Sequence, residues 1–251
     1  MRWAGRSSGV LRRVVRYTRP AWRRWPPPPN CLTHPAGEPD VVAPARSGTL
    51  PAVDHDRKRF VELALSNEIN RAVLERAPRL GVPDWWLTAG ALFQTVWNRL
   101  DGRAPTAGIQ DYDPFYFDPT DLSWDAEDQV IRSAGALFAD LDATVEVRNE
   151  ARVHLWYEEH FGVPAPAFRS SCDAVDHFAS TTCCYAITRA TDEILVYAPH
   201  GYTDLFAQRV RPNPRLAPRE VYEAKAARWA TEWPGLTVDP WPEPSGSASL
   251  S

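Results

Sequence analysis

Helical and strand-like patterns alternate along the middle of this chain, and their order restricts the fold more than any single motif does. The helical patterns, in which apolar residues recur every three or four positions, cover residues 60–80, 90–100, 123–141 and 149–162. The strand-like runs cover residues 84–90, 108–118, 144–148, 183–188 and 194–197. The last two runs are close enough to form a hairpin. This order predicts an α/β (α+β) fold in which helices cover a mixed sheet.

Both ends of the chain differ in composition from this middle. Residues 1–56 combine Arg and Trp with a four-proline run, and residues 239–251 are rich in Pro and Ser. Neither segment has enough apolar residues to build a core. We therefore expect a disordered N-terminal tail over 1–56, a folded domain over 57–238 and a disordered C-terminal tail over 239–251. On this view the N-terminal tail is dispensable for folding.

The formal net charge of −4 conceals an asymmetry between the N-terminal tail and the rest of the chain. Residues 1–29 hold eight Arg and no acid, so the remainder carries −4 minus 8, or −12. An acidic body disfavours broad nucleic-acid binding, which needs an excess of Lys and Arg. The basic tail leaves contact with RNA or an anionic membrane open. A small phosphorylated ligand held through a metal ion is compatible with the acidic body.

Several classes of protein are disfavoured by composition. No apolar stretch is long enough to span a bilayer, and the N-terminal region lacks the apolar core of a signal peptide. The four cysteines show no spacing typical of a zinc site, which favours reduced thiols in a cytosol. A cytoplasmic protein without a membrane partner is therefore expected.

Two aspartates, Asp111 and Asp113, lie one residue apart within the apolar run at 108–118. On a strand both side chains point from the same face, so the two carboxylates repel each other. One of them should then titrate above the usual Asp pKa of about 3.9. A structural reading, in which Arg or backbone donors pair with the acids, and a cation-binding reading both remain open on residue type alone.

Three further features favour the cation-binding reading: the room that Gly108 and Pro114 leave around the pair, a small-residue turn and a third carboxylate. The small-residue turn Ala89–Gly90–Ala91 opens a helix, where backbone N–H groups can approach phosphate oxygens. Glu146 stands between two valines, so it occupies one strand face alone and supplies a third carboxylate. Together with the two aspartates it makes an oxygen cluster suited to Mg²⁺ or Mn²⁺. Divalent ions held in this way stabilise the attacking and leaving oxygens of a phosphoryl transfer.

The ordered set "TAGALFQTVWNRL", "IQDYDPFYFD", "VEVRNEARVH", "APHGYTDLF" and "VRPNP" resembles a bacterial family of nucleotidyltransferase-like proteins. That family is similar to the polymerase-beta-type nucleotidyltransferases, and the resemblance covers roughly residues 58–238. It implies a short mixed sheet flanked by helices and a Mg²⁺-dependent transfer of a nucleoside monophosphate from an NTP to a hydroxyl acceptor. The acceptor, a small molecule or a macromolecule, is left undefined by the resemblance.

The resemblance also implies a role for each site residue. Gly90 sits in the phosphate turn, Asp111 and Asp113 are metal ligands, and Glu146 is the third acid that activates the acceptor hydroxyl. The chain departs from the pattern at Ala91, where a Gly or Ser is usual. This departure keeps open a catalytically inactive module that binds nucleotide or metal. An RNA-modifying transferase that uses the basic tail is a further alternative.

Other residues near these motifs have two readings each. Pro114 stands where a strand residue is usual, so the strand is expected to end or to lie at an edge there. Glu150 replaces an expected Gln. Arg152 can clamp a phosphate or form a structural ion pair, and His154 has the same two readings. Asp204 can cap a helix or join the site.

Overall fold

The computed structural model describes residues 52–190 and 193–243, and its elements follow the predicted alternation. The α-helices are α1 (Ala52–Ala64), α2 (Glu68–Arg76), α3 (Gly90–Leu100), α4 (Trp124–Leu137), α5 (Tyr157–Phe161), α6 (Ser171–Val175), α7 (Thr203–Phe206) and α8 (Arg219–Glu232). Short 3₁₀ helices are η2 (Ala77–Leu80), η3 (Glu150–Leu155) and η4 (Thr181–Cys183). The strands are β1 (Trp86–Thr88), β2 (Asp113–Tyr116), β3 (Arg148–Asn149), β4 (Ala186–Ala190), β5 (Glu193–Tyr197), β6 (Arg209–Val210) and β7 (Thr237–Val238).

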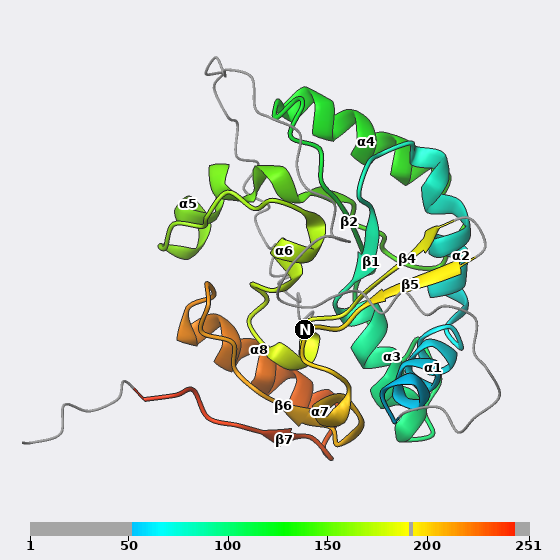
Figure 1. Cartoon of the computed structure of the whole chain (residues 1–251), viewed down its shortest axis with the longest axis vertical. Coiled ribbons are helices and arrows are strands. Elements are labelled where there is room, and N and C mark those ends of the chain that lie inside the picture. Colours follow the sequence, from blue (N-terminus) through cyan, green and yellow to red (C-terminus); the bar gives the residue numbers. More distant parts are fainter. Residues whose placement is uncertain (1–51, 191–192, 244–251) are drawn as a thin grey trace, which may run out of the picture.

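A five-stranded mixed sheet in the order β3-β2-β1-β4-β5 organises the molecule. Strands β2 and β3 are parallel, while β1 pairs antiparallel with both β2 and β4, and β5 pairs antiparallel with β4. Helices α1, α2 and α3 lie on one side of this sheet and α6 lies on the other (Figure 1). The mixed α/β architecture predicted from the sequence is therefore confirmed.

Pro114 lies inside β2, a strand with a neighbour on each side, so the prediction that the strand ends or lies at an edge there was wrong. Tyr112 donates its N–H to Thr144 on the β3 side, and backbone groups alternate sides along a strand. The nitrogen of Pro114 therefore faces β3. Proline has no N–H to donate, and the ladder is interrupted there, between the Tyr112–Val145 bridge and β3. The sheet accommodates proline by losing one bond rather than by ending.

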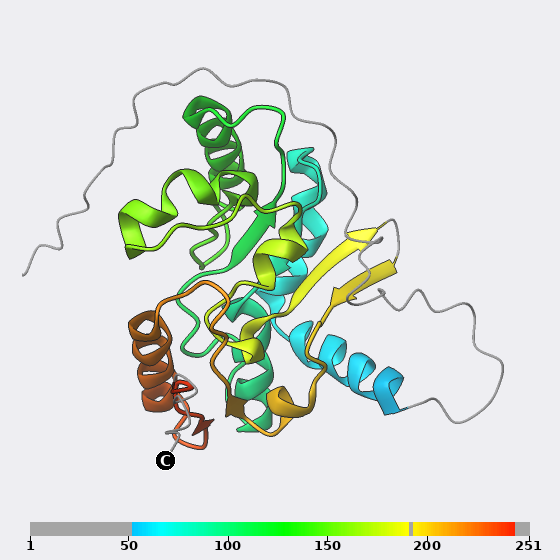
Figure 2. The same ribbon diagram turned by 60° about the vertical axis from the view of Figure 1, so that its left-hand side comes forward.

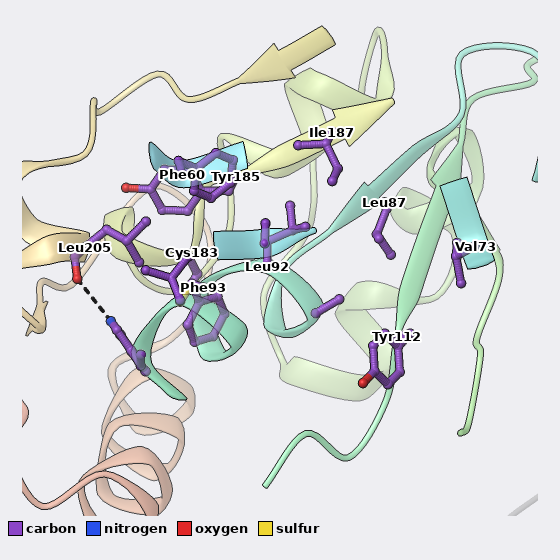
Figure 3. Packing of buried hydrophobic residues seen from close by; sticks show 14 of the residues in the cluster. Phe60, Val73, Leu87, Leu92, Phe93, Tyr112, Cys183, Tyr185, Ile187 and Leu205 are labelled. Carbon is purple, nitrogen blue, oxygen red and sulfur yellow. Dashed lines mark hydrogen bonds between the residues drawn. The ribbon is translucent and has the colours of Figure 1, made fainter. Parts of the chain in front are cut away.

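The main core lies between the sheet and helices α1 to α3. Leu92 of α3 lies on the side of Ile187 of β4, whereas the Phe93 ring lies beside Cys183, as Figure 3 shows. Leu205 accepts a hydrogen bond from the indole N–H of Trp97 at 3.3 Å, drawn as a dashed line. Each fully buried side chain of this size contributes about 1.5–3 kcal/mol to folding. This packing fixes α3, and with it the turn at Gly90.

Helix ends follow the predicted caps in some places and not in others. The Ser123 hydroxyl accepts a hydrogen bond from the Ala126 N–H, which confirms the predicted cap of α4. Gly162 ends α5 with a φ of 74°. The helix predicted over 149–162 is instead a 3₁₀ helix followed by the short α5. Trp156, with φ of −134° and ψ of −16°, breaks the helical geometry between them.

The folded region extends past both predicted limits. Helix α1 begins at Ala52, so the expected boundary at residue 57 falls inside it. Beyond residue 238, the Asp239 carbonyl accepts a hydrogen bond from the Tyr222 hydroxyl at 2.5 Å, and Trp241 packs on the Tyr222 ring. Residues 1–51 and 244–251, which include most of both expected tails, lie outside the described residues.

Two other expectations concern the described part of the chain. Cys172, Cys183 and Cys184 are buried, as the sequence predicted, whereas Cys31 lies outside the described residues. Across residues 52–190 and 193–243, no helix has the length and apolarity needed to cross a membrane.

Candidate active site

A cleft of about 520 Å³ opens where the start of α3, strand β2 and helix α8 meet. Figure 2 shows α8 beside α3 on this side of the molecule. The cleft is lined by Ala89, Gly90, Phe93, Gln94, Gln110, Asp111, Asp113, Phe115, Phe178, Ala179, Ser180, Cys183, Ala224, Lys225, Arg228 and Trp229. Both predicted aspartates and the predicted glycine turn thus share one cavity.

Strand register explains why the acids meet. Asp113 is the first residue of β2, and Asp111 lies two residues earlier on the same side. Tyr112 bridges Val145 and Phe115 pairs with Arg148, which places Glu146 opposite Asp113 on the same face of the sheet. We predicted that Asp111 and Asp113 project into one cleft beside Gly90 with Glu146 close to both; the cleft contains the two aspartates and Gly90, whereas Glu146 does not line it.

Burial and like charges act together on Asp113. Burial is the larger cause, and repulsion from Asp111 and then Glu146 adds to it, so the pKa of Asp113 rises to about 7. This confirms the expectation that one aspartate titrates high, although the sequence had suggested repulsion alone. Glu150 is 6% exposed, and burial followed by the charge of Asp113 raises its pKa to about 8.

Glu146 is placed differently from the other two acids. It does not line the cleft; its side chain is 47% exposed and lies 3.4 Å from the guanidinium of Arg148. Within the described residues, no three His, Cys, Asp or Glu side chains gather closely enough to hold a metal ion. The expected three-acid metal cluster is therefore not formed in this geometry.

Asp111 and Asp113 nevertheless fit a divalent cation by the chemistry of their side chains. Both supply carboxylate oxygens, the ligands that Mg²⁺ and Mn²⁺ prefer, and both face the cavity. Their mutual repulsion, one cause of the raised pKa of Asp113, becomes attraction when a cation lies between them. These two residues are the ones that would hold the ion, with Glu146 nearby on the same face.

The turn before α3 has an unusual backbone. Ala89 adopts a φ of 55° and a ψ of −131°, a region that favours glycine, and such strain is found mainly at functional sites. A Cβ at Gly90 would lie 2.6 Å from Nε2 of Gln94, so only glycine fits without a shift. Among the described residues, no acceptor is assigned to the N–H groups of Gly90 and Ala91, the first two of the helix. The turn can therefore bind an anion.

Helix α8 brings two cations to the cleft that sequence reasoning missed. Lys225 and Arg228 are exposed, lie one turn apart and both line the cavity. The charge of Lys225 acts against the rise in the pKa of Asp113. Arg228 also bonds the Gln110 carboxamide. In the sequence, only their spacing of three residues indicated that they share one side of a helix. That spacing does not reveal that this side of the helix faces the cleft.

Three other candidate residues lie outside this cavity. Arg152 is buried in an ion pair with Glu127 and donates to the Leu122 carbonyl at 3.1 Å, so its structural reading is the one observed. Asp204 pairs with Arg211 at 2.7 Å. Burial lowers the pKa of His154, whose Nδ1 has no partner in the described part of the chain.

Comparison with known proteins agrees with this geometry. A family model described as "Nucleotidyltransferase" matches residues 75–238, which include the turn, both aspartates and α8. The chain belongs to this nucleotidyltransferase family. A solved structure described as revealing a CCA-adding enzyme head domain aligns with a TM-score of 0.60. The alignment covers 77% of this chain and 98% of the solved chain, with 22% sequence identity. This similarity supports the nucleotidyltransferase fold. No curated protein matches the chain.

Proposed function

We propose that the protein is a metal-dependent nucleotidyltransferase that transfers a nucleoside monophosphate from an NTP to a hydroxyl acceptor. One observation carries this proposal. A single cleft joins an anion-binding turn, two carboxylates with oxygen atoms for a divalent cation, and the cations of α8. An NTP with its metal ion needs these three kinds of group.

Each residue has a distinct role in this proposal. The N–H groups at Gly90 bind phosphate oxygens, and Lys225 and Arg228 neutralise the triphosphate from the opposite wall. Asp111 and Asp113 hold the divalent cation, which when bound offsets the negative charge at the reacting phosphate. Glu146, exposed on the same face of the sheet, accepts the proton of the acceptor hydroxyl. Its position outside the cavity means that the acceptor approaches from the open side of the cleft.

A double substitution tests the metal site. Asp111→Asn with Asp113→Asn removes both charges and keeps nearly the same shape. In the parent protein, Mg²⁺ or Mn²⁺ should raise the melting temperature, and NTP should add to it only when metal is present. The double variant should be at least as stable as the parent without metal, because the repulsion is gone, and should lose both effects. Thermal unfolding with each ligand measures this.

Pyrophosphate release measures the reaction itself. The parent protein should release pyrophosphate from NTP in the presence of Mg²⁺ and an extract that contains the acceptor, and the double variant should not. A parent that gains stability from NTP and metal without any release would be a binding module instead. A parent that ignores metal, together with a strongly destabilised variant, would show that the aspartates are structural.

A further inference from the structure

The inner wall of the cleft carries two buried polar atoms that have no hydrogen-bond partner within residues 52–190 and 193–243. They are Oε1 of Gln94 on α3 and Nε1 of Trp229 on α8. Both side chains are only 4% exposed, and both line the cleft. A buried polar atom without a partner destabilises the fold, so two of them beside one cavity point to a ligand that pairs with them.

The two side chains come from helices that line the same cavity and contact each other there. Phe93, the neighbour of Gln94, contacts the Trp229 ring edge-on with centroids 5.2 Å apart. Gln94 folds back over the start of α3, where its Nε2 lies 2.6 Å from the position of a Cβ on Gly90. Gln94 therefore lies beside the turn that binds phosphate in the proposed function.

The chemistry of the unpaired atoms identifies the part of the ligand that meets them. Oε1 of Gln94 needs a donor, and the fully ionised oxygens of a triphosphate only accept. A sugar hydroxyl both donates and accepts, so it can pair with either end of the carboxamide. The indole N–H of Trp229 needs an acceptor, which every nucleobase provides on its edges. The nucleoside, directly attached to the phosphates, supplies both.

We propose that Gln94 binds a ribose hydroxyl of the nucleotide and that Trp229 donates a hydrogen bond to its base. The cleft then discriminates a ribonucleotide from the deoxy analogue that lacks this hydroxyl. This inference rests on the proposed function and deepens it by naming the part of the nucleotide that is recognised and the residues that recognise it.

Two substitutions separate these contacts from packing. Gln94→Met keeps the length and burial of the side chain and removes its hydrogen-bonding atoms. Trp229→Phe keeps the ring contact with Phe93 and removes the N–H. Gln129→Met, on the exposed side of α4, is the matched control. For each protein, with Mg²⁺ present, we would measure the affinity for the tightest-binding ribonucleoside triphosphate, its 2′-deoxy and 3′-deoxy analogues, and tripolyphosphate.

The parent protein should bind the ribonucleotide about tenfold more tightly than one of the deoxy analogues, a difference of about 1.4 kcal/mol. Gln94→Met should remove this ratio and leave tripolyphosphate affinity unchanged. Trp229→Phe should weaken all three nucleotides equally, keep the ratio and leave tripolyphosphate affinity unchanged. Without ligand, Gln94→Met should not melt lower than the parent, because it removes an unpaired atom. Trp229→Phe should melt somewhat lower, because the smaller ring loses packing against Trp97.

Three outcomes would overturn the inference. The first is a parent that binds tripolyphosphate but binds the ribonucleotide and both deoxy analogues equally. This result is obtained on the parent alone, so it does not depend on the folding of any variant. The second is a Gln94→Met protein that loses tripolyphosphate affinity as strongly as ribonucleotide affinity, which would make Gln94 a phosphate contact. The third, a parent that binds neither NTP nor tripolyphosphate, would overturn the proposed function together with this inference.

Discussion

Glu150 illustrates how a single buried carboxyl connects the site with stability. It lies at the start of η3, is 6% exposed, and has a pKa raised to about 8 by burial and then by Asp113. In the unfolded chain the same carboxyl releases its proton near the ordinary value of 4.5. Between these two pH values the folded state holds an extra proton, so the free energy of unfolding decreases as pH rises from 4.5 to about 8. Above pH 8 this loss is complete.

Glu150→Gln should remove this loss, because the amide stays neutral at every pH. We expect the variant to be more stable than the parent by roughly 2–5 kcal/mol at pH 9 and nearly equal to it at pH 4.5. Urea unfolding at both pH values measures the difference. The variant should still lose some free energy of unfolding as pH rises, because Asp113 also has a raised pKa, of about 7. If the variant were destabilised equally at both pH values, Glu150 would contribute to stability through the packing of its side chain and not through its proton.

Helix α8 shows how one element can serve both the core and the cleft. Its buried side, with Tyr222, Ala226 and Trp229, packs against the body of the protein. Lys225 and Arg228 lie on the part of its surface that faces the cavity. Arg219 lies on the same helix outside the cavity and pairs with Glu223 at 2.7 Å.

Replacing the cations of α8 should weaken nucleotide binding. Lys225→Ala and Arg228→Ala should each raise the Kd for NTP about tenfold, as expected for the loss of one charge-assisted contact of about 1.4 kcal/mol. Both residues are exposed, so the melting temperature should stay within about 2 °C of the parent value. Arg219→Ala is the control and should bind NTP like the parent. Equal effects of all three substitutions would assign the loss to overall charge rather than to the cleft.

At the scale of the whole molecule, the core is built from residues that come after the basic segment. Phe60 of α1 is fully buried against Tyr185 and Tyr202, with ring centroids 5.1 and 5.4 Å away. Arg57, also of α1, donates to the Ile194 carbonyl of β5 at 3.0 Å. The helix that joins the body thus supplies its own contacts with the core and the sheet.

Deletion of residues 1–51 should therefore leave the fold intact. This segment is rich in Arg and Pro, and its apolar side chains are scattered among them rather than grouped on one face. We expect the melting temperature to change by less than about 3 °C, measured by circular dichroism. Affinity for NTP at physiological salt should also be unchanged. A drop of many degrees would place Trp22 or Trp25 against the body, while deletion of 1–56 should cost more because it removes the first turn of α1.

The sequence by itself determined the features that depend on neighbouring residues. The spacing of Leu92, Val96 and Trp97 predicted α3, and strand parity placed Asp111 and Asp113 on one side. Periodicity and parity are local properties of the backbone, so a short stretch of sequence reveals them. The family resemblance predicted the fold from short motifs as well, and these motifs lie in or beside the same elements.

Only the tertiary structure decided which distant elements meet. It brought Lys225 and Arg228 to the aspartates, and it paired Arg152 with Glu127 instead of a phosphate. It also set Pro114 within an inner strand, where the pairing direction determines which hydrogen bond is lost. Such contacts depend on how apolar faces are buried across the whole chain. A charged side chain therefore acquires a functional or a structural partner only after the core has formed.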